Sequence, residues 1–413
     1  MIYDFDSLPN RRTTDSAKWN NYPEDVLPLF VADMDFVSPE PVIHALQARV
    51  AHGVFGYPGN VVATQGKPSG LAEIILQRLE QLYAWKVQEE ELVFLPGVVT
   101  GFNLACQALA VPASGGQSPG GGVLVQTPVY SPFLSAPANA GLVRQEMELT
   151  HCSDGTYSID WQAFEAAFHL ETRMFLLCNP HNPIGRVFQR DELERMAENC
   201  LRRGVVICSD EIHCDLLFSG QRHIPIASLD PEIARSTITL MAPSKTFNIA
   251  GLECAFAVIQ NESLRRRYRH AFKGLVHGVN VLGWVAAEAA YRHGQEWLDQ
   301  LLVYLEANRD LLYDFVRREL PAVQMAKPEG TYLAWLDCRA AGIDGNSSVQ
   351  STVSLQSSPY EFFLKQAKVA LNDGKTFGRG GEGFVRLNFG CPRAMLLEAL
   401  ERMKTALQVT YGA

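Results

Sequence analysis

Short apolar runs separated by helical patterns constrain the fold of this 413-residue chain most strongly. Continuous apolar runs of four to seven residues are typical of strands that are buried on both faces. Amphipathic helical patterns, such as Val98–Ala110 and Asp191–Arg203, lie between most of the runs. This alternation predicts an α/β fold with a mostly parallel sheet covered on both faces. The predicted strands are Leu92–Leu95, Val123–Gln126, Met174–Cys178, Val205–Ser209, Ile238–Ala242 and Cys254–Ile259.

The pattern changes after about residue 285. A long helical stretch and a helix between two strands predict a smaller α+β domain there. The N-terminal 45 residues are irregular and contain the acidic pair Asp33 and Asp35. We therefore expect a large domain over residues 46–285, and a small domain formed by 286–413 together with 1–45. The elements predicted for the small domain are the helices Trp284–Arg318 and Pro359–Ala370, the strands Thr331–Leu336 and Phe384–Asn388, and a terminal helix from Arg393.

Three patches rich in Gly, Ser or Gln interrupt the chain: Gly59–Gly70, Ser114–Gly122 and Gly342–Ser358. They contain few apolar side chains to bury and are predicted to be mobile surface loops.

Charge and cysteine usage narrow the class of protein. The formal net charge is −9 and no basic stripe occurs, which argues against a nucleic-acid partner. The densest basic cluster, Arg265–Arg267 with Arg269, is interpreted as a solvated helix face. The nine cysteines form no CxxC pair and lie mostly in apolar stretches, which favours reduced thiols and a cytoplasmic location. The acidic start lacks the order of a signal peptide, and no apolar run is long enough to span a membrane.

Polar residues follow three of the predicted strands. In parallel sheets, ligands bind at the carboxyl ends of the strands. Asn179–Gly185 contains two X-Pro steps, Asp210 and Glu211 come next, and the third turn contains Ser244 and Lys245. Each feature has a simpler interpretation: a tight turn, a structural ion pair, or a lysine held by a counter-charge.

Taken together, the three turns fit one chemistry. A carboxylate at Asp210 can keep a pyridine nitrogen protonated, and an amide at Asn182 can donate to a ring oxygen. The amine of Lys245 can bond to an aldehyde and later move a proton at Cα, and Ser244 can donate to a phosphate. Pyridoxal phosphate has all four of these groups: a pyridine nitrogen, a ring oxygen, an aldehyde and a phosphate.

The same segments resemble the signature blocks of class I/II aminotransferases of fold type I. This resemblance covers nearly the whole chain except the three Gly/Ser patches. The amino-acid sequences of the blocks are similar to those of the cystathionine β-lyase (C–S lyase) branch. It implies an aspartate-aminotransferase-like fold with a seven-stranded type of sheet and a smaller α+β domain. The blocks begin at Val31 (VADMDF), Phe55 (FGY), Pro96 (PGVV), Thr127 (TPVY), Asn179 (NPHNPIG), Ser209 (SDEIH), Ser244 (SKTFNIAG), Pro328 (PEGTYLAW) and Val385 (VRLNFG).

The resemblance assigns roles around the ring. It implies that Lys245 binds the cofactor covalently, that Asp210 faces the pyridine nitrogen, and that Asn182 contacts the ring oxygen. Tyr130 stands where an aromatic ring stacks on the cofactor, although packing in the core is a simpler role for this tyrosine. His213 replaces a tyrosine of many aminotransferases; an imidazole can still reach the ring oxygen, and a structural histidine is the alternative.

The resemblance also implies which residues bind the phosphate of the cofactor and which bind the substrate. Val98 and Val99 begin a helix whose N–H groups suit a phosphate, with Ser244 as a further donor. Tyr57 matches a tyrosine that contacts both the substrate and the phosphate of a neighbouring subunit, which implies a homodimer with shared active sites. Arg386 matches the arginine that binds the α-carboxylate of an amino-acid substrate, together with Asn182. Glu253 stands where many relatives have a phosphate-binding arginine, so it must turn away, be protonated or find a cation.

The branch implies β-elimination from L-cysteine S-conjugates such as cystathionine, giving pyruvate, ammonia and a thiol. Two alternatives stay open on the residues alone. Transamination begins with the same proton removal and is not excluded by any residue named. A regulatory binding protein on the same fold would expose an apolar patch outside the active-site cleft. No metal site is expected.

Overall fold

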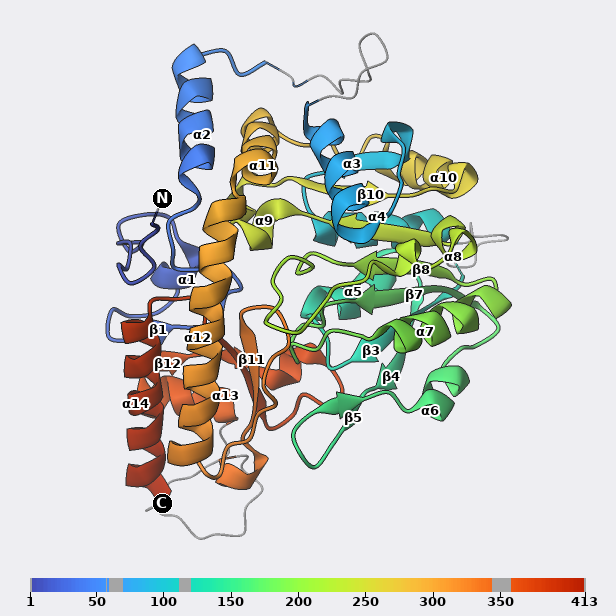
Figure 1. Ribbon diagram of the computed structural model, residues 1–413. Helices are drawn as coiled ribbons and strands as arrows, with labels where there is room; N and C mark the ends of the chain where they lie inside the picture. The colour runs from blue at the N-terminus through green and yellow to red at the C-terminus, as the bar shows by residue number, and fades with distance from the viewer. Residues whose placement is uncertain (1, 57, 59–69, 111–119, 344–357, 412–413) are drawn as a thin grey trace.

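A seven-stranded sheet forms the centre of the computed structural model, which describes residues 2–56, 58, 70–110, 120–343 and 358–411 (Figure 1). The strand order is β2–β10–β9–β8–β7–β3–β4. All neighbours from β9 to β4 pair in parallel, and β10 runs antiparallel to both of its neighbours. The α/β fold with a mostly parallel sheet is therefore confirmed. The strands are β2 (Leu92–Leu95), β3 (Gly122–Thr127), β4 (Val143–Glu148), β7 (Thr172–Cys178), β8 (Val206–Asp210), β9 (Thr237–Met241) and β10 (Ala255–Val258).

Successive residues of the central strands point to opposite faces of the sheet. In β7, Met174 and Leu176 pack in one apolar cluster while Phe175 and Leu177 pack in another. This double burial explains the continuous apolar runs of the sequence. Strand β4 escaped the sequence prediction because it lies at the sheet edge and has only two apolar residues, Val143 and Met147.

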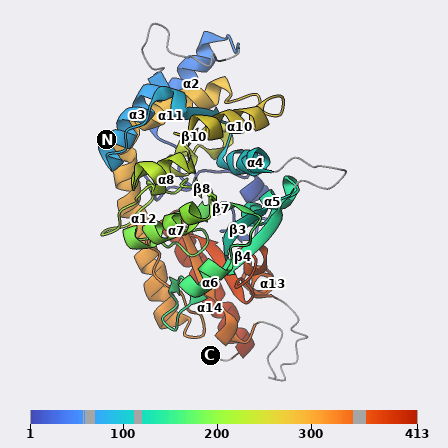
Figure 2. The ribbon, with the colours of Figure 1, turned by 90° about the vertical axis from the view of Figure 1, so that its right-hand side faces the viewer.

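Helices cover both faces of the sheet (Figures 1 and 2). One cluster combines side chains of α4, α5 and α10 with the strands, and the other combines those of α6, α7 and α8 with the opposite face. A third group lies around β2 and β10 and includes α3 and α11 (Val281–His293). The helices are α3 (Gly70–Tyr83), α4 (Val98–Leu109), α5 (Ser131–Asn139), α6 (Trp161–Ala166), α7 (Arg190–Arg202), α8 (Pro231–Arg235), α9 (Pro243–Thr246) and α10 (Glu262–Phe272).

The basic cluster of α10 lies mostly on a solvated helix face, as expected, because Arg266, Arg267 and Arg269 are exposed and Arg265 alone of the four is buried. Arg265 is buried and donates to the carbonyl of Ile259, and Arg267 donates to the carbonyl of Ala108. Arg269 donates to the carbonyl of Glu90, so these side chains hold backbone ends of neighbouring elements. The exposed Arg266 pairs with Glu262.

The long helical stretch after residue 280 is two helices, α11 (Val281–His293) and α12 (Gln295–Glu319), rather than the single helix predicted from the sequence. They meet at Gly294, where a Cβ atom would lie 2.5 Å from the Ala290 carbonyl oxygen and 2.6 Å from the Phe247 ring. The close approach of that ring requires glycine and places the break there.

A second, antiparallel sheet has the order β11–β14–β13, with β11 (Leu333–Asp337), β13 (Asn372–Asp373) and β14 (Phe384–Asn388). The predicted helix over residues 359–370 is wrong at its end. Helix α13 (Pro359–Phe362) continues as a π-helical turn (Phe363–Ala367), and β12 (Val369–Ala370) then pairs with β1 (Leu27–Pro28). Lys368 has φ +56° and ends the helical path. The terminal helix α14 (Arg393–Tyr411) packs against α12.

The N-terminal residues join this second region. Besides β1, they contain the short helix α1 (Ala17–Asn20) and α2 (Glu40–His52), which begins earlier than the regular pattern predicted at about residue 45. Phe5, Trp19 and Leu29 pack in one apolar cluster with residues of α12, α14 and the antiparallel sheet. The domain boundaries at residues 45 and 285 stay a prediction.

Most of the three Gly/Ser patches lies outside the described residues, although Gly70 begins α3 and Gly122 begins β3. Among the described helices, none combines the length and the apolar character that a membrane span requires.

A buried ion-pair cluster fixes the N-terminal segment. Asp35 is completely buried and contacts Lys18 Nζ at 2.7 Å, Arg11 at 2.7 Å and the Trp19 indole N–H at 2.8 Å. The Lys18 side chain is itself 1% exposed. Loss of either partner leaves an uncompensated buried charge.

We predict that Asp35→Asn lowers the free energy of unfolding by about 3 kcal/mol, because breaking a buried pair typically costs about 3–5 kcal/mol. Urea unfolding measures the change. Asp25→Asn is the matched control: Asp25 pairs with Lys368 at 3.4 Å, and both side chains are at least half exposed. That control should lose less than about 1 kcal/mol. Equal losses in the two variants would contradict the role of burial.

Candidate active site

The turns that follow β7, β8 and β9 line a cavity of about 460 Å³ together with the start of α4. Register explains the convergence: Cys178 at the end of β7 lies opposite Asp210, and Asp210 lies opposite Leu240 of β9. Arg386 adjoins the cavity through Asn182. Tyr57 lies outside the described residues. The expected site residues that line the cavity are Val98, Val99, Tyr130, Asn182, Asp210, His213, Ser244 and Lys245.

Lys245 extends from α9 into the cavity. Its Nζ donates to the carbonyl of Ala32, 2.6 Å away, in the N-terminal segment. Burial lowers the pKa of Lys245 to about 8; the Asp33 carboxylate raises it, and the Arg386 guanidinium lowers it further. A large fraction of this amine is therefore neutral near pH 8, as a nucleophile or a base requires.

Asp210 and Glu211 have different surroundings although they are adjacent. Asp210 faces the cavity and accepts a hydrogen bond from the Ile212 N–H at 3.1 Å; burial raises its pKa to about 7. Glu211 is completely buried and contacts His223 Nε2 at 2.8 Å and Ser209 Oγ at 2.9 Å. Of the two, Asp210 is the carboxylate that can serve a ligand.

His213 presents a neutral imidazole to the cavity. Burial lowers its pKa to about 3, and Lys245 and Arg386 lower it further. Its Nδ1 is buried and has no hydrogen-bond partner among the described residues. The ring packs edge-on against Tyr332, with the centroids 5.9 Å apart. An unpaired ring nitrogen at this position leaves hydrogen-bonding capacity for a bound group.

The start of α4 offers backbone donors. Gly97 caps the helix with extended backbone and no side-chain hydrogen bond, and the first residues of α4 line the cavity. Such a terminus favours an anion. Ser244 lines the same cavity. Glu253 also lines it, is solvent-exposed and makes no ion pair within the described part of the chain.

Arg386 is a buried cation held by neutral acceptors. Its guanidinium donates to Asn182 Oδ1 at 2.9 Å, to the Phe30 carbonyl at 2.9 Å and to Asn372 Oδ1 at 2.6 Å. No carboxylate pairs with it among the described residues, and burial lowers its pKa to about 10. A ligand carboxylate would therefore supply the missing counter-charge. Because Asn182 Oδ1 is used, the Asn182 Nδ2 remains to donate elsewhere.

Sequence reasoning missed the part played by the N-terminal backbone. The carbonyls of Phe30 and Ala32 accept from Arg386 and Lys245, and Tyr332 also donates to the Ala32 carbonyl at 2.8 Å. Main-chain acceptors leave no signature in side-chain types. Asn372 was missed as well, although it lies directly opposite Arg386 across β13 and β14.

The arrangement matches the chemistry of pyridoxal phosphate. The anion-binding helix start suits its phosphate, the buried Asp210 suits a protonated ring nitrogen, and His213 and Asn182 retain unused donor capacity. The amine of Lys245 suits its aldehyde. The residues present therefore fit this group.

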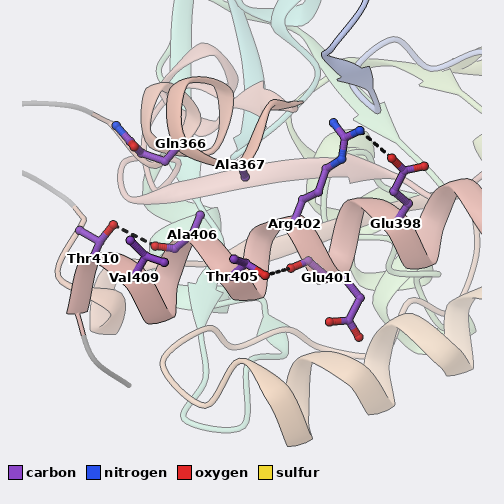
Figure 3. Close-up of a pocket in the computed structure, with 9 residues that line it drawn as sticks. All are labelled: Gln366, Ala367, Glu398, Glu401, Arg402, Thr405, Ala406, Val409 and Thr410. Atoms are coloured by element: carbon purple, nitrogen blue, oxygen red, sulfur yellow. Dashed lines mark hydrogen bonds and ion pairs between the residues drawn. The ribbon is translucent and has the colours of Figure 1, made fainter.

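A second hollow, of about 390 Å³, lies between α14 and the π-helical turn Phe363–Ala367 (Figure 3). None of the expected site residues lines it. Its charged groups include an ion pair between Arg402 and Glu398 at 2.6 Å.

Comparison of the sequence with those of known proteins shows the family to which the chain belongs. Residues 24–403 match the family described as aminotransferase class I and II. The chain belongs to this family. It is similar to the cystathionine beta-lyase PatB of Bacillus subtilis, with 40% identity over 98% of this chain and 99% of that protein.

Solved structures of the same family extend the likeness. Cystalysin from Treponema denticola, which contains a pyridoxal 5′-phosphate cofactor, has a TM-score of 0.89 at 33% identity, covering 99% of this chain and all of that one. The PLP-bound C–S lyase of Staphylococcus hominis has a TM-score of 0.88 at 32% identity, with the same coverage. The expected aspartate-aminotransferase-like fold is thereby confirmed.

We predict that Lys245 of the cofactor-free protein reacts with cyanate with a pH midpoint of about 8, against about 10.4 for an ordinary lysine. Asp33→Asn should lower this midpoint, because the Asp33 carboxylate stabilises the charged amine. Asp25→Asn, on the exposed surface, should leave it unchanged. Peptide mapping by mass spectrometry measures the rate at each pH. A midpoint at the ordinary lysine value would refute the electrostatic description of the cavity.

Proposed function

We propose that this chain is a pyridoxal-phosphate-dependent carbon–sulfur lyase that cleaves L-cysteine S-conjugates, such as cystathionine, by β-elimination. The observation that carries the proposal is the cavity that Lys245 and Asp210 both line, beside which Arg386 is a buried cation with no carboxylate partner among the residues that the structure describes. The relatives named cystathionine beta-lyase and C–S lyase support the reaction type.

Each residue has a task toward the cofactor. When bound, pyridoxal phosphate supplies an aldehyde that captures amines and a pyridinium ring that accepts electrons from Cα. Asp210 would hold the proton of the ring nitrogen, and Tyr130 would cover one ring face. His213 and the Asn182 amide would donate to the ring oxygen. The N–H groups of Val98 and Val99, with the hydroxyl of Ser244, would bind the phosphate.

The substrate is positioned by two groups. Arg386 and Asn182 bind the α-carboxylate, and the contact of Arg386 with Asn182 Oδ1 leaves the Asn182 Nδ2 free to donate. Lys245, whose pKa burial brings to about 8, takes the Cα proton. The Cβ–S bond then breaks and its electron pair leaves on the thiolate. The 2-aminoacrylate that remains hydrolyses in water to pyruvate and ammonia.

A homodimer with shared active sites is part of the proposal. Val50, Val54 and Phe55 are each more than half exposed where α2 ends, at one extremity of the molecule (Figures 1 and 2). A second copy would bury these apolar side chains. Tyr57, which follows at once, would then reach the partner's phosphate and substrate. A cytoplasmic location is also proposed, supported by nine free cysteines, eight of them buried.

We predict that Asp210→Asn reduces kcat about a thousandfold. Two opposite charges at ~4 Å are worth about 4 kcal/mol at an effective dielectric near 20, and the amide removes one of them. Glu211→Gln is the matched control, because Glu211 contacts His223 and Ser209 instead of the cavity. It should change kcat far less, although it destabilises the fold. Steady-state kinetics on folded protein compares the two. Comparable losses of kcat would mean that the wrong carboxylate is assigned to the ring.

The reaction type is tested with L-cystathionine in the absence of any keto acid. We expect equal amounts of pyruvate, ammonia and homocysteine over many turnovers per cofactor, and no product from Lys245→Ala. An aminotransferase would instead stop after one half-reaction, with pyridoxamine phosphate formed, and would resume when a keto acid is added. A regulatory binding protein would give no turnover by itself. Either of these results would overturn the lyase proposal.

A further inference from the structure

One carboxylate connects two of the turns that line the cavity. Asp215 lies in the turn after β8, five residues beyond Asp210, and its side chain is 6% exposed. Its Oδ2 accepts from the hydroxyl of Thr246 at 3.0 Å, and its Oδ1 accepts from the guanidinium of Arg78. Thr246 is completely buried and directly follows Lys245 on α9.

Arg78 supplies the charge that the buried Asp215 needs. It extends from α3 and lies over the ring of Tyr291, 5.2 Å from the centroid. Burial lowers the pKa of Arg78, but the facing Asp215 carboxylate raises it above its ordinary value, so the guanidinium stays charged. A buried carboxylate without such a cation would be strongly disfavoured. Three separate elements therefore meet at Asp215.

Helix α9 is short, and the side-chain hydrogen bonds of Asn248, just after it, reach Met34 and Phe36 in the N-terminal segment rather than the turn after β8. The helix has four residues, and its N-cap, Ala242, makes no side-chain hydrogen bond. The backbone hydrogen bonds of Phe247 to Pro243 and of Ile249 to Ser244 stay within the same turn. They give the turn its shape but do not fix its orientation relative to the turn after β8.

We propose that Asp215, neutralised by Arg78, is a positioning residue that fixes Lys245 relative to Asp210 through the hydroxyl of Thr246. The proposal rests on the proposed function of Lys245. Misplacement of a reacting group by about 1 Å can reduce a rate about a hundredfold, so a lost anchor should affect the steps in which Lys245 acts. Substrate binding should change little, because Arg386 and Asn182 belong to other elements.

The test uses Thr246→Val, which keeps the side-chain shape and removes the donor. Thr237→Val is the matched control: Thr237 is also buried and donates to the Ile233 carbonyl at 2.7 Å, but it lies at the opposite end of β9. Thr246→Ser, which restores the hydroxyl, should behave like the wild type to within about twofold.

Two cofactor probes separate positioning from binding. Pyridoxal phosphate reports covalent attachment through its visible absorbance, while pyridoxine phosphate has no aldehyde and reports binding alone. In Thr246→Val we expect attachment to slow about tenfold or more, while the affinity for pyridoxine phosphate changes by less than about threefold. With cystathionine, kcat should fall about tenfold or more and KM should stay within about threefold.

Thr237→Val should match the wild type in all of these measurements, even where thermal unfolding shows a loss of stability. The proposal is overturned if Thr246→Val attaches pyridoxal phosphate at the wild-type rate, if Thr237→Val slows attachment equally, or if Thr246→Ser fails to restore it. Failure of the proposed function is recognised separately in the wild type: borohydride reduction and peptide mapping would then find no label on Lys245.

Discussion

Parallel pairing of β7, β8 and β9 is the constraint on which the site depends. Neighbouring strands lie about 4.8 Å apart, and the register places the ends of these three strands at one edge of the sheet. The turns that carry Asn182, Asp210 and Lys245 therefore lie close together because their strands are neighbours in the sheet. No contact between loops is needed to bring them there. Double burial holds the register, because a shift by one residue would exchange the side chains of Met174 and Phe175 between two different clusters.

The fold could be predicted wherever local pattern and burial agree. The strands at the sheet centre are apolar on both faces, so their sequences identify them to within two residues. Prediction failed where the deciding partner is remote. Gly294 separates two helices because the Phe247 ring packs against it. Val369 and Ala370 leave the helical path to pair with Leu27 and Pro28, more than 300 residues earlier. No local pattern encodes such a pairing.

The site shows the same division. Residues whose side-chain chemistry is unusual at a strand end, such as Asp210 and Lys245, were identified from the sequence, and the structure brings them to one cavity. Residues whose importance depends only on their position in the fold were not identified from the sequence. Thr246 is an ordinary threonine until Asp215 is found beside it, and Asn372 becomes relevant only through its place opposite Arg386. Such residues acquire a role from the elements that the fold brings next to them.

The N-terminal carbonyls have a consequence for how this scaffold can change. Phe30 and Ala32 hold Arg386 and Lys245 through main-chain oxygens, which every amino acid supplies. The side chain of Ala32 meanwhile lines the cavity. Substitutions at that position can therefore reshape the cavity wall while both main-chain hydrogen bonds persist. The shape of the cavity wall and the placement of the Lys245 amine thus depend on different atoms of the same residue, so the first can vary without loss of the second.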